Sequence, residues 1–348
     1  MEDPPHTIAV VSGKGGSGKT LFCVAAAQVL ASANRKVLLV DADVATAGMS
    51  YYLNVSEISK LAPGLAEYLL SDTLEARSIC QPLRTIKNVS FVTCGVRRAH
   101  VSLNKYTERL EGFFGSELAS AHDYIILDCR GGSDEDTIAV CSRAQHILVV
   151  AETDTSSIQS TAYLIRLLHE SDLSEKILGF ALNKVFDDPT HISRAASYLI
   201  ESQHIGSIPF DLDSTRRYIL GKLPHQDSDF VYGVGSILYK VFGQETALAG
   251  FRDFGPRYFG ELSLRNRGFR ITGLMFAMLF TMVAYLGLVI EVLDRLGQGP
   301  SPLESVRPSL ILVILGLAGM FATLDAVRGI LARGLERYVT LLRGRRDH

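Results

Sequence analysis

Hydrophobic residues in the first 250 positions form short β-branched runs that alternate with longer, helix-like stretches. The runs predict strands at Thr7–Ser12, Val37–Asp41, Val89–Thr93, Tyr124–Asp128, Ile147–Glu152, Leu178–Asn183 and Gly206–Pro209. The clearest helix-like stretches are Leu21–Ala33, Ser157–His169 and Thr190–Gln203. Continuously apolar strands that alternate with helices are typical of a mostly parallel sheet covered on both faces. We therefore expect a doubly wound α/β fold.

Two much longer apolar stretches lie near the C-terminal end of the sequence. Residues 271–290 are 20 residues without a charge, which as a helix would span about 30 Å, the thickness of the hydrocarbon core. Residues 308–324 add 17 uncharged residues, near the lower limit for a membrane span. We expect a transmembrane hairpin with helices at 271–290 and 308–327. The competing interpretation is a pair of buried helices in a soluble domain, but such helices seldom need so long an uninterrupted apolar run.

Charge also divides the chain near residue 250. The 348 residues include 35 Lys and Arg against 37 Asp and Glu, so the net charge of −2 looks uninformative. Residues 1–250 hold 22 basic and 29 acidic residues, for −7, whereas residues 251–348 hold 13 basic residues, all Arg, and 8 acidic ones, for +5. Residues 1–250 therefore lack the excess of basic side chains that binds nucleic-acid phosphates, which argues against a nucleic-acid partner.

The arginines lie mainly on the outer sides of the two apolar stretches, and the positive-inside rule then places both ends of the chain in the cytoplasm. We expect an inner (cytoplasmic) membrane protein with two spans and the lipid bilayer as one partner. The predicted organisation is an α/β domain at 1–246, a basic aromatic juxtamembrane linker at 247–270, the two spans with a short non-cytoplasmic loop at 291–307, and an Arg-rich amphipathic tail at 328–348.

The strongest motif runs from Gly13 to Thr20, Gly-Lys-Gly-Gly-Ser-Gly-Lys-Thr, between an expected strand and an expected helix. It matches the P-loop pattern G-x-x-x-x-G-K-[ST], in which glycines let backbone N–H groups face phosphate oxygens. Lys19 is expected to reach the β- and γ-phosphates, and the Thr20 hydroxyl is expected to bind Mg²⁺. The candidate phosphate-binding residues are Gly13, Gly15, Gly16, Ser17, Gly18, Lys19, Thr20 and Leu21.

Three carboxylates end expected strands of the same sheet. Asp41 and Asp43 follow Val37–Val40, and Asp128 follows Tyr124–Leu127. The carboxyl edge of a parallel sheet is where such folds bind ligands, although a single strand-end Asp often only caps a turn. Three acids beside a P-loop favour metal and water chemistry, with ATP and Mg²⁺ as the expected ligands.

The second lysine of the loop, Lys14, together with VLLVDADVA and YIILDCRGG, resembles the MinD/ParA family of deviant Walker A ATPases. The resemblance covers about residues 5–245, including ALNKV at 181–185 and IGSIPFD at 205–211. It implies that ATP promotes a homodimer in which Lys14 reaches the partner's phosphates. One departure is Arg130, since relatives usually carry Pro near this position, and it leaves the rate of turnover open.

The same resemblance implies roles for individual residues. Asp43 would orient the attacking water and act with Lys14 and Lys19 as the catalytic set. Asp41 would support Mg²⁺ and the switch, and Asp128 would hold a Mg²⁺-bound water. Asn183 would hydrogen-bond the base, and Pro209 and Phe210 would border the adenine.

These features predict a membrane-anchored ATPase that hydrolyses ATP slowly and positions or regulates a membrane-associated protein assembly. Its partner, a membrane or cytoplasmic protein, is not identified by the sequence. One alternative is a regulator of polysaccharide export similar to bacterial tyrosine kinases, against which Lys14 and the tail LLRGRRDH count. Another is a non-hydrolysing nucleotide-gated scaffold, suggested by Arg130. An iron–sulfur ATPase using Cys94 and Cys129 is disfavoured because no Gly-rich cysteine loop is present.

Overall fold

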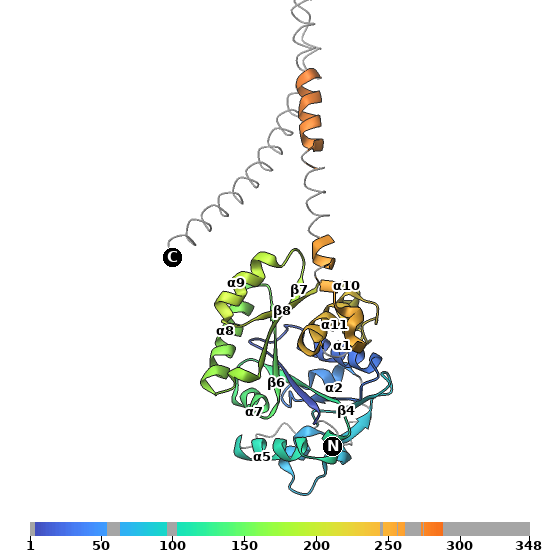
Figure 1. Cartoon of the computed structure of the whole chain (residues 1–348), viewed down its shortest axis with the longest axis vertical. Coiled ribbons are helices and arrows are strands. Elements are labelled where there is room, and N and C mark those ends of the chain that lie inside the picture. The colour runs from blue at the N-terminus through green and yellow to red at the C-terminus, as the bar shows by residue number, and fades with distance from the viewer. Residues whose placement is uncertain are drawn as a thin grey trace, which may run out of the picture. The chain divides into compact units, whose positions relative to one another are not determined.

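The structure is a computed structural model that describes residues 4–53, 63–95, 103–243, 246–255, 257–261, 273 and 275–287. The chain divides into two compact units, Met1–Gly260 and Glu261–His348. The first unit contains an eight-stranded sheet in the order β3-β4-β2-β5-β1-β6-β7-β8 (Figure 1). Its strands are β1 (His6–Ser12), β2 (Val37–Asp41), β3 (Cys80–Pro82), β4 (Val89–Val92), β5 (Tyr124–Gly131), β6 (His146–Glu152), β7 (Ile177–Val185) and β8 (His204–Pro209).

Every pair of neighbouring strands in this sheet is parallel, apart from the edge pair formed by β3 and β4. The mostly parallel α/β sheet expected from the apolar runs is therefore confirmed. The helices are α1 (Lys19–Ser32), α2 (Gly48–Tyr52), α4 (Leu65–Leu70), α5 (Leu103–Phe114), α6 (Glu117–Ser120), α7 (Glu135–Arg143), α8 (Thr155–Glu170), α9 (Thr190–Ile200), α10 (Leu212–Ile219) and α11 (Asp229–Phe242). Three short 3₁₀ turns are η1 (Ala76–Ile79), η2 (Ser174–Lys176) and η3 (Thr246–Phe251).

Helices cover the sheet on both faces. On one face α1 packs against β1, β2 and β5, and α11 packs against α1 and β8. On the other face α7 and α8 pack against β1, and α9 packs against α8 (Figure 1). The buried apolar side chains of α1 and α11 and of the sheet face beneath them form one hydrophobic cluster, the α1–α11 core. Side chains alternate along a strand, so Ile8 and Val10 of β1 belong to this core, while buried Ala9 and Val11 face the other way. The central strand is thereby buried on both sides.

The first unit extends beyond the predicted domain boundary at residue 246. In η3, Leu248 is fully buried and joins the α1–α11 core. Phe251 packs on Gly235 and lies 5.3 Å from the Tyr232 ring of α11, and Phe254 lies 5.5 Å from the same ring. These two aromatic side chains of the predicted juxtamembrane linker therefore pack on α11 of the first unit.

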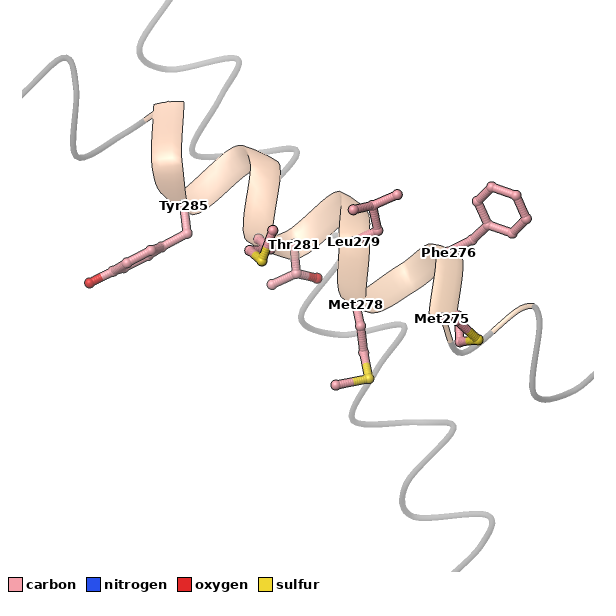
Figure 2. A pocket seen from close by; sticks show the side chains of 7 residues that line it. Met275, Phe276, Met278, Leu279, Thr281 and Tyr285 are labelled. Carbon is pink, nitrogen blue, oxygen red and sulfur yellow. The ribbon is translucent and has the colours of Figure 1, made fainter.

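The described part of the second unit is Glu261, Gly273 and a helix over residues 275–287, and the large apolar side chains of this helix are mostly exposed. Figure 2 shows that Phe276, Met278 and Tyr285 project from this helix in different directions. Among the residues that the structure describes, no helix combines the length and apolarity needed to cross a membrane. The predicted span 271–290 is only partly described, and the loop 291–307, the span 308–327 and the tail 328–348 lie outside the described residues. The transmembrane hairpin is therefore not confirmed.

Candidate functional site

The P-loop connects β1 to α1 at the carboxyl edge of the sheet, and two of its glycines are required by their surroundings. A Cβ atom on Gly13 would lie 2.2 Å from the backbone carbon of Ser160 in α8. Gly18 has a φ of +91°, and a Cβ atom there would lie 2.3 Å from the side-chain nitrogen of Asn183. Only glycine fits such positions without displacing backbone or adopting a strained conformation. The loop therefore packs closely against both α8 and the end of β7.

Two buried carboxylates meet beside the P-loop. Asp41 and Asp128 are register partners in the neighbouring parallel strands β2 and β5, and both side chains are at most 2% exposed. The Thr20 hydroxyl donates a 2.7 Å hydrogen bond to Asp128 Oδ2. Asp41 Oδ2 accepts from the backbone N–H of Ser50 at 2.8 Å and from its hydroxyl at 2.7 Å.

Burial makes the negative charges of Asp41 and Asp128 unfavourable unless a cation lies nearby. Burial, and to a lesser degree the negative charge of Asp41, raises the pKa of Asp128 to about 7. Burial likewise raises the pKa of Asp41 to about 6, against the opposing hydrogen bonds from Ser50. Two buried acids next to each other are costly as anions unless a positive charge compensates them.

Mg²⁺ fits this arrangement. It usually binds through one or two carboxylates, waters and substrate phosphates rather than in an all-protein cage. Thr20, Asp128 and Asp41 supply one hydroxyl and two carboxylates within one small region. The described residues contain no group of three or more His, Cys, Asp and Glu side chains able to hold a metal by themselves.

The two P-loop lysines lie in different environments. Lys19 is buried, and its ammonium group donates a 2.7 Å hydrogen bond to the Ser12 hydroxyl. Lys14 instead lies at the surface, where its ammonium group donates to both carboxylate oxygens of Asp154, at 2.9 and 3.1 Å. The hydrogen bond to Asp154 raises the pKa of Lys14. A pocket beside the P-loop is lined by Lys19 but not by Lys14.

The acid expected to orient water is held in a local turn. Asp43 Oδ1 accepts from the backbone N–H of Thr46 at 3.0 Å, and the Thr46 hydroxyl bonds to Asp43 Oδ2. The chain after Asp128 packs on the P-loop, because a Cβ on Gly131 would lie 2.8 Å from the backbone nitrogen of Gly15. Arg130, by contrast, pairs with Asp134 at 3.3 Å and takes no part in lining the pocket.

A pocket joins the P-loop to the ends of β7 and β8. Of the predicted nucleotide-binding residues it includes Gly16, Gly18, Lys19, Thr20, Leu21, Asn183, Pro209 and Phe210. Gly13, Gly15 and Ser17 do not line it, and neither do the three acids. The pocket also contains residues that the sequence analysis missed, namely Lys184, Asp211, Thr215, Tyr218 and Phe230.

Of these missed residues, Asp211 carried a signal in the sequence as the last residue of the IGSIPFD segment, and so did Lys184. Lys184 directly follows Asn183 in the ALNKV segment, and it donates to the Gly16 carbonyl at 2.8 Å and to Glu152 at 2.6 Å. Tyr218 and Phe230 come from α10 and α11, which the sequence analysis did not predict, and no motif surrounds them.

Comparisons with known proteins agree with this geometry. Residues 8–224 match the CobQ/CobB/MinD/ParA nucleotide binding domain family. An uncharacterised ATP-binding protein of Methanocaldococcus jannaschii is 26% identical over 245 residues, which cover 68% of this chain and 87% of that protein. The antiactivator FleN of Pseudomonas aeruginosa is 25% identical over 234 residues, covering 62% of this chain and 77% of FleN.

Solved structures share the fold. The MinD cell division protein of Aquifex aeolicus has a TM-score of 0.58 at 19% identity, covering 68% of this chain and 97% of that one. MinD of Pyrococcus horikoshii, solved with Mg-ADP, has a TM-score of 0.57 at 23% identity, covering 71% of this chain and 98% of that one. The family match spans well over half of the sequence and contains the whole P-loop and both buried acids. The chain therefore belongs to the CobQ/CobB/MinD/ParA family of nucleotide-binding domains, whose MinD/ParA members are ATPases.

Proposed function

We propose that this protein is a membrane-anchored ATPase that binds Mg²⁺-ATP at the P-loop, forms a homodimer and hydrolyses ATP slowly. In this proposal the nucleotide state controls contact with a membrane-associated protein assembly, which the ATPase positions or regulates. The observation that carries it is the separation of the two lysines, since Lys19 lines the pocket while Lys14 lies outside it on the surface. A P-loop lysine in that place is available to the phosphates of a second copy.

The chemistry of hydrolysis needs charge neutralisation and one positioned water. Bound Mg²⁺ would neutralise phosphate charge, and the residues placed to hold it are Thr20 and Asp128, with Asp41 in support. Lys19 contributes a second positive charge inside the pocket. Asp43 is the candidate for orienting the water, and to do so its carboxylate has to leave the turn that it forms with Thr46.

The geometry favours hydrolysis over the scaffold alternative. Arg130 was the reason to consider a non-hydrolysing protein, but its guanidinium pairs with Asp134 at the start of α7 instead of entering the pocket. The segment that carries Arg130 still reaches the P-loop through Gly131. The tyrosine kinase alternative has no observation of its own in its favour.

Membrane anchoring is proposed from the sequence and from the helix over residues 275–287. This helix exposes large apolar side chains around most of its circumference, among them Phe276, Met282 and Leu286. Its Thr281 hydroxyl donates to the Ala277 carbonyl at 2.8 Å, which satisfies that polar group within the helix. The flanking arginines support a cytoplasmic location for the ATPase unit and the C-terminal tail.

A protein partner is proposed by analogy with the relatives. The similar structures include a MinC:MinD cell division protein complex of A. aeolicus, and the relatives include a septum site-determining protein and an antiactivator. Those names describe proteins that control the place or activity of other proteins.

The decisive experiment measures the oligomeric state of the full chain in detergent with ATP and Mg²⁺. Wild type should dimerise, Asp43→Ala should accumulate as ATP-bound dimers, and Lys14→Ala should stay monomeric while it still binds nucleotide. The measurement is light scattering after size-exclusion chromatography, with ADP as the control ligand. Wild-type monomers in saturating ATP would refute the dimer.

A further inference from the structure

The end of β7 is strained at the point where it meets the P-loop. Lys184 has a φ of 56°, in the left-handed region that a residue with a side chain rarely adopts. The pairing of β7 with β8 also shifts here, since Leu182 pairs with Ser207 but Val185 pairs with Pro209, so β7 carries one extra residue. Bulges and strained residues of this kind concentrate at functional sites, where they re-aim side chains.

The bulge brings two consecutive side chains to the same loop. Successive side chains of a regular strand point to opposite faces, yet both Asn183 and Lys184 reach the P-loop. The Asn183 amide donates to the Ser17 carbonyl at 2.8 Å, and the Lys184 ammonium donates to the Gly16 carbonyl at 2.8 Å. Two neighbouring carbonyl groups of the loop therefore accept hydrogen bonds from consecutive side chains at the end of β7.

Each of the two side chains is itself held in place. Asn183 Oδ1 accepts the backbone N–H of Lys184 at 2.8 Å, which fixes the orientation of the amide. The Lys184 ammonium bonds to Glu152 Oε1 at 2.6 Å, and Glu152 is the last residue of the neighbouring strand β6. The Asn183 side chain is almost fully buried, whereas the Lys184 and Glu152 side chains are 43% and 21% exposed. The hydrogen bonds of Asn183 are therefore strengthened by the exclusion of water, and the Lys184–Glu152 bond is strengthened by the charge on both partners.

These bonds determine where the loop's N–H groups point. In a trans peptide the carbonyl and the following N–H lie in one plane on opposite sides. Holding the Gly16 and Ser17 carbonyls toward β7 therefore turns the N–H groups of Ser17 and Gly18 away from it, where they are available to an anion.

We infer that Lys184 is a positioning residue of the nucleotide site, which acts with Asn183 and Glu152 to preset the P-loop amides for the phosphates common to ADP and ATP. This inference rests on the proposed nucleotide site and adds a residue to it. Lys184 does not need to touch the nucleotide, because its ammonium is already shared between the Gly16 carbonyl and Glu152. Its removal should then weaken ADP and ATP equally.

The test compares Lys184→Met with wild type by titration calorimetry of the full chain in detergent, with Mg-ADP and with a non-hydrolysable ATP analogue. We expect a loss of about tenfold in affinity for both ligands, which corresponds to about 1.4 kcal/mol. Lys184→Arg should recover part of the loss. Glu152→Gln, which leaves the lysine but removes its anchor, should weaken both ligands by a smaller factor.

Lys176 provides a matched control near the other end of the same strand. Its ammonium also donates to two backbone carbonyls, those of Ser142 at 2.6 Å and Ala144 at 2.9 Å, but it is not part of the pocket. Lys176→Met should leave both affinities within about twofold of wild type, even where it lowers thermal stability.

Two results would overturn the inference. A loss confined to the ATP analogue would mean that Lys184 contacts the γ-phosphate directly, and unchanged affinity for both ligands would mean that the loop needs no such support. If Lys184→Met fails to fold, the affinities of Lys184→Gln and Glu152→Gln for the two ligands are compared with those of wild type instead. Failure of wild type to bind either nucleotide would refute the proposed function, which separates that failure from the failure of the positioning role.

Discussion

Lys14 is held in its own chain mainly by the carboxylate of Asp154. Asp154 accepts the Lys14 ammonium, and it also caps α8 by accepting the backbone N–H of Ser157 at 3.0 Å. Asn caps a helix about as well as Asp. Asp154→Asn therefore removes the ion pair with Lys14 and keeps the helix cap.

Asp154→Asn should make the proposed homodimer form at a lower ATP concentration, because it removes the closer ion pair of Lys14 and leaves the longer one with Glu152 at 3.9 Å. The pair is partly exposed, so the expected shift is modest, about two- to fivefold. Light scattering across an ATP titration measures it. The control is Asp172→Asn, which changes an acid beyond the far end of α8, and an unchanged midpoint in Asp154→Asn would contradict the role given to this ion pair.

At the scale of single residues, the sequence predicted positions that a motif defines and missed those that depend on distant packing. The P-loop glycines, Thr20 and Asp128 follow from local patterns at strand ends. The pairing of Asp41 with Asp128 requires that β2 and β5 be neighbours, although 82 residues separate the two strands. Tyr218 reaches the pocket only because α10 lies over it, and no local pattern carries that information.

At the scale of elements, the strand predictions were accurate because continuous apolar runs leave few alternatives. Six of the seven predicted strands start within one residue of the observed ones, and the seventh, β8, begins two residues earlier than expected. Strand β3 was missed, since three residues that include Pro82 give too weak a signal. Helix α9 ends at Ile200 instead of Gln203, because Glu201 takes a left-handed conformation that closes it.

The contact between the P-loop and α8 gives a prediction about packing. Gly13→Ala should destabilise the first unit by about 1–3 kcal/mol or more, since the added methyl group meets the backbone of Ser160 and Thr161. Gly15→Ala is the matched change in the same loop, and a Cβ there meets no atom within 4 Å. Thermal unfolding of the two variants should show a clear drop only for Gly13→Ala, and equal melting temperatures would argue against this contact.

The packing of η3 gives a second prediction. Leu248→Ala should cost about 2–5 kcal/mol of stability, as for other large-to-small changes in a core, because Leu248 is fully buried against the α1–α11 core. Denaturant unfolding of the full chain measures the change. Leu199→Ala in α9, where the side chain is 55% exposed, is the control and should have little effect. If the two variants unfold alike, the domain ends near residue 246, as the sequence suggested.

At the scale of the whole molecule, the proposed topology is open to a direct test. The arginine distribution predicts that residues 1–246 and the C-terminal tail share the cytoplasmic side of the membrane. A reporter that is active only in the periplasm should therefore be silent when fused after residue 348 and active when inserted in the loop 291–307. The opposite pattern would overturn the hairpin orientation.

The outward position of Lys14 has a consequence for how such a protein would respond to its own abundance. In the proposed dimer each chain would supply a pocket for its own nucleotide and a lysine for the pocket of its partner, so a single copy would be half of a reaction centre. Under the proposed anchoring, two halves meet by diffusion within a surface and not through a volume. The rate of ATP turnover would then follow the number of copies per area of membrane, and crowding them into a small patch would switch hydrolysis on there while dispersed copies stay idle.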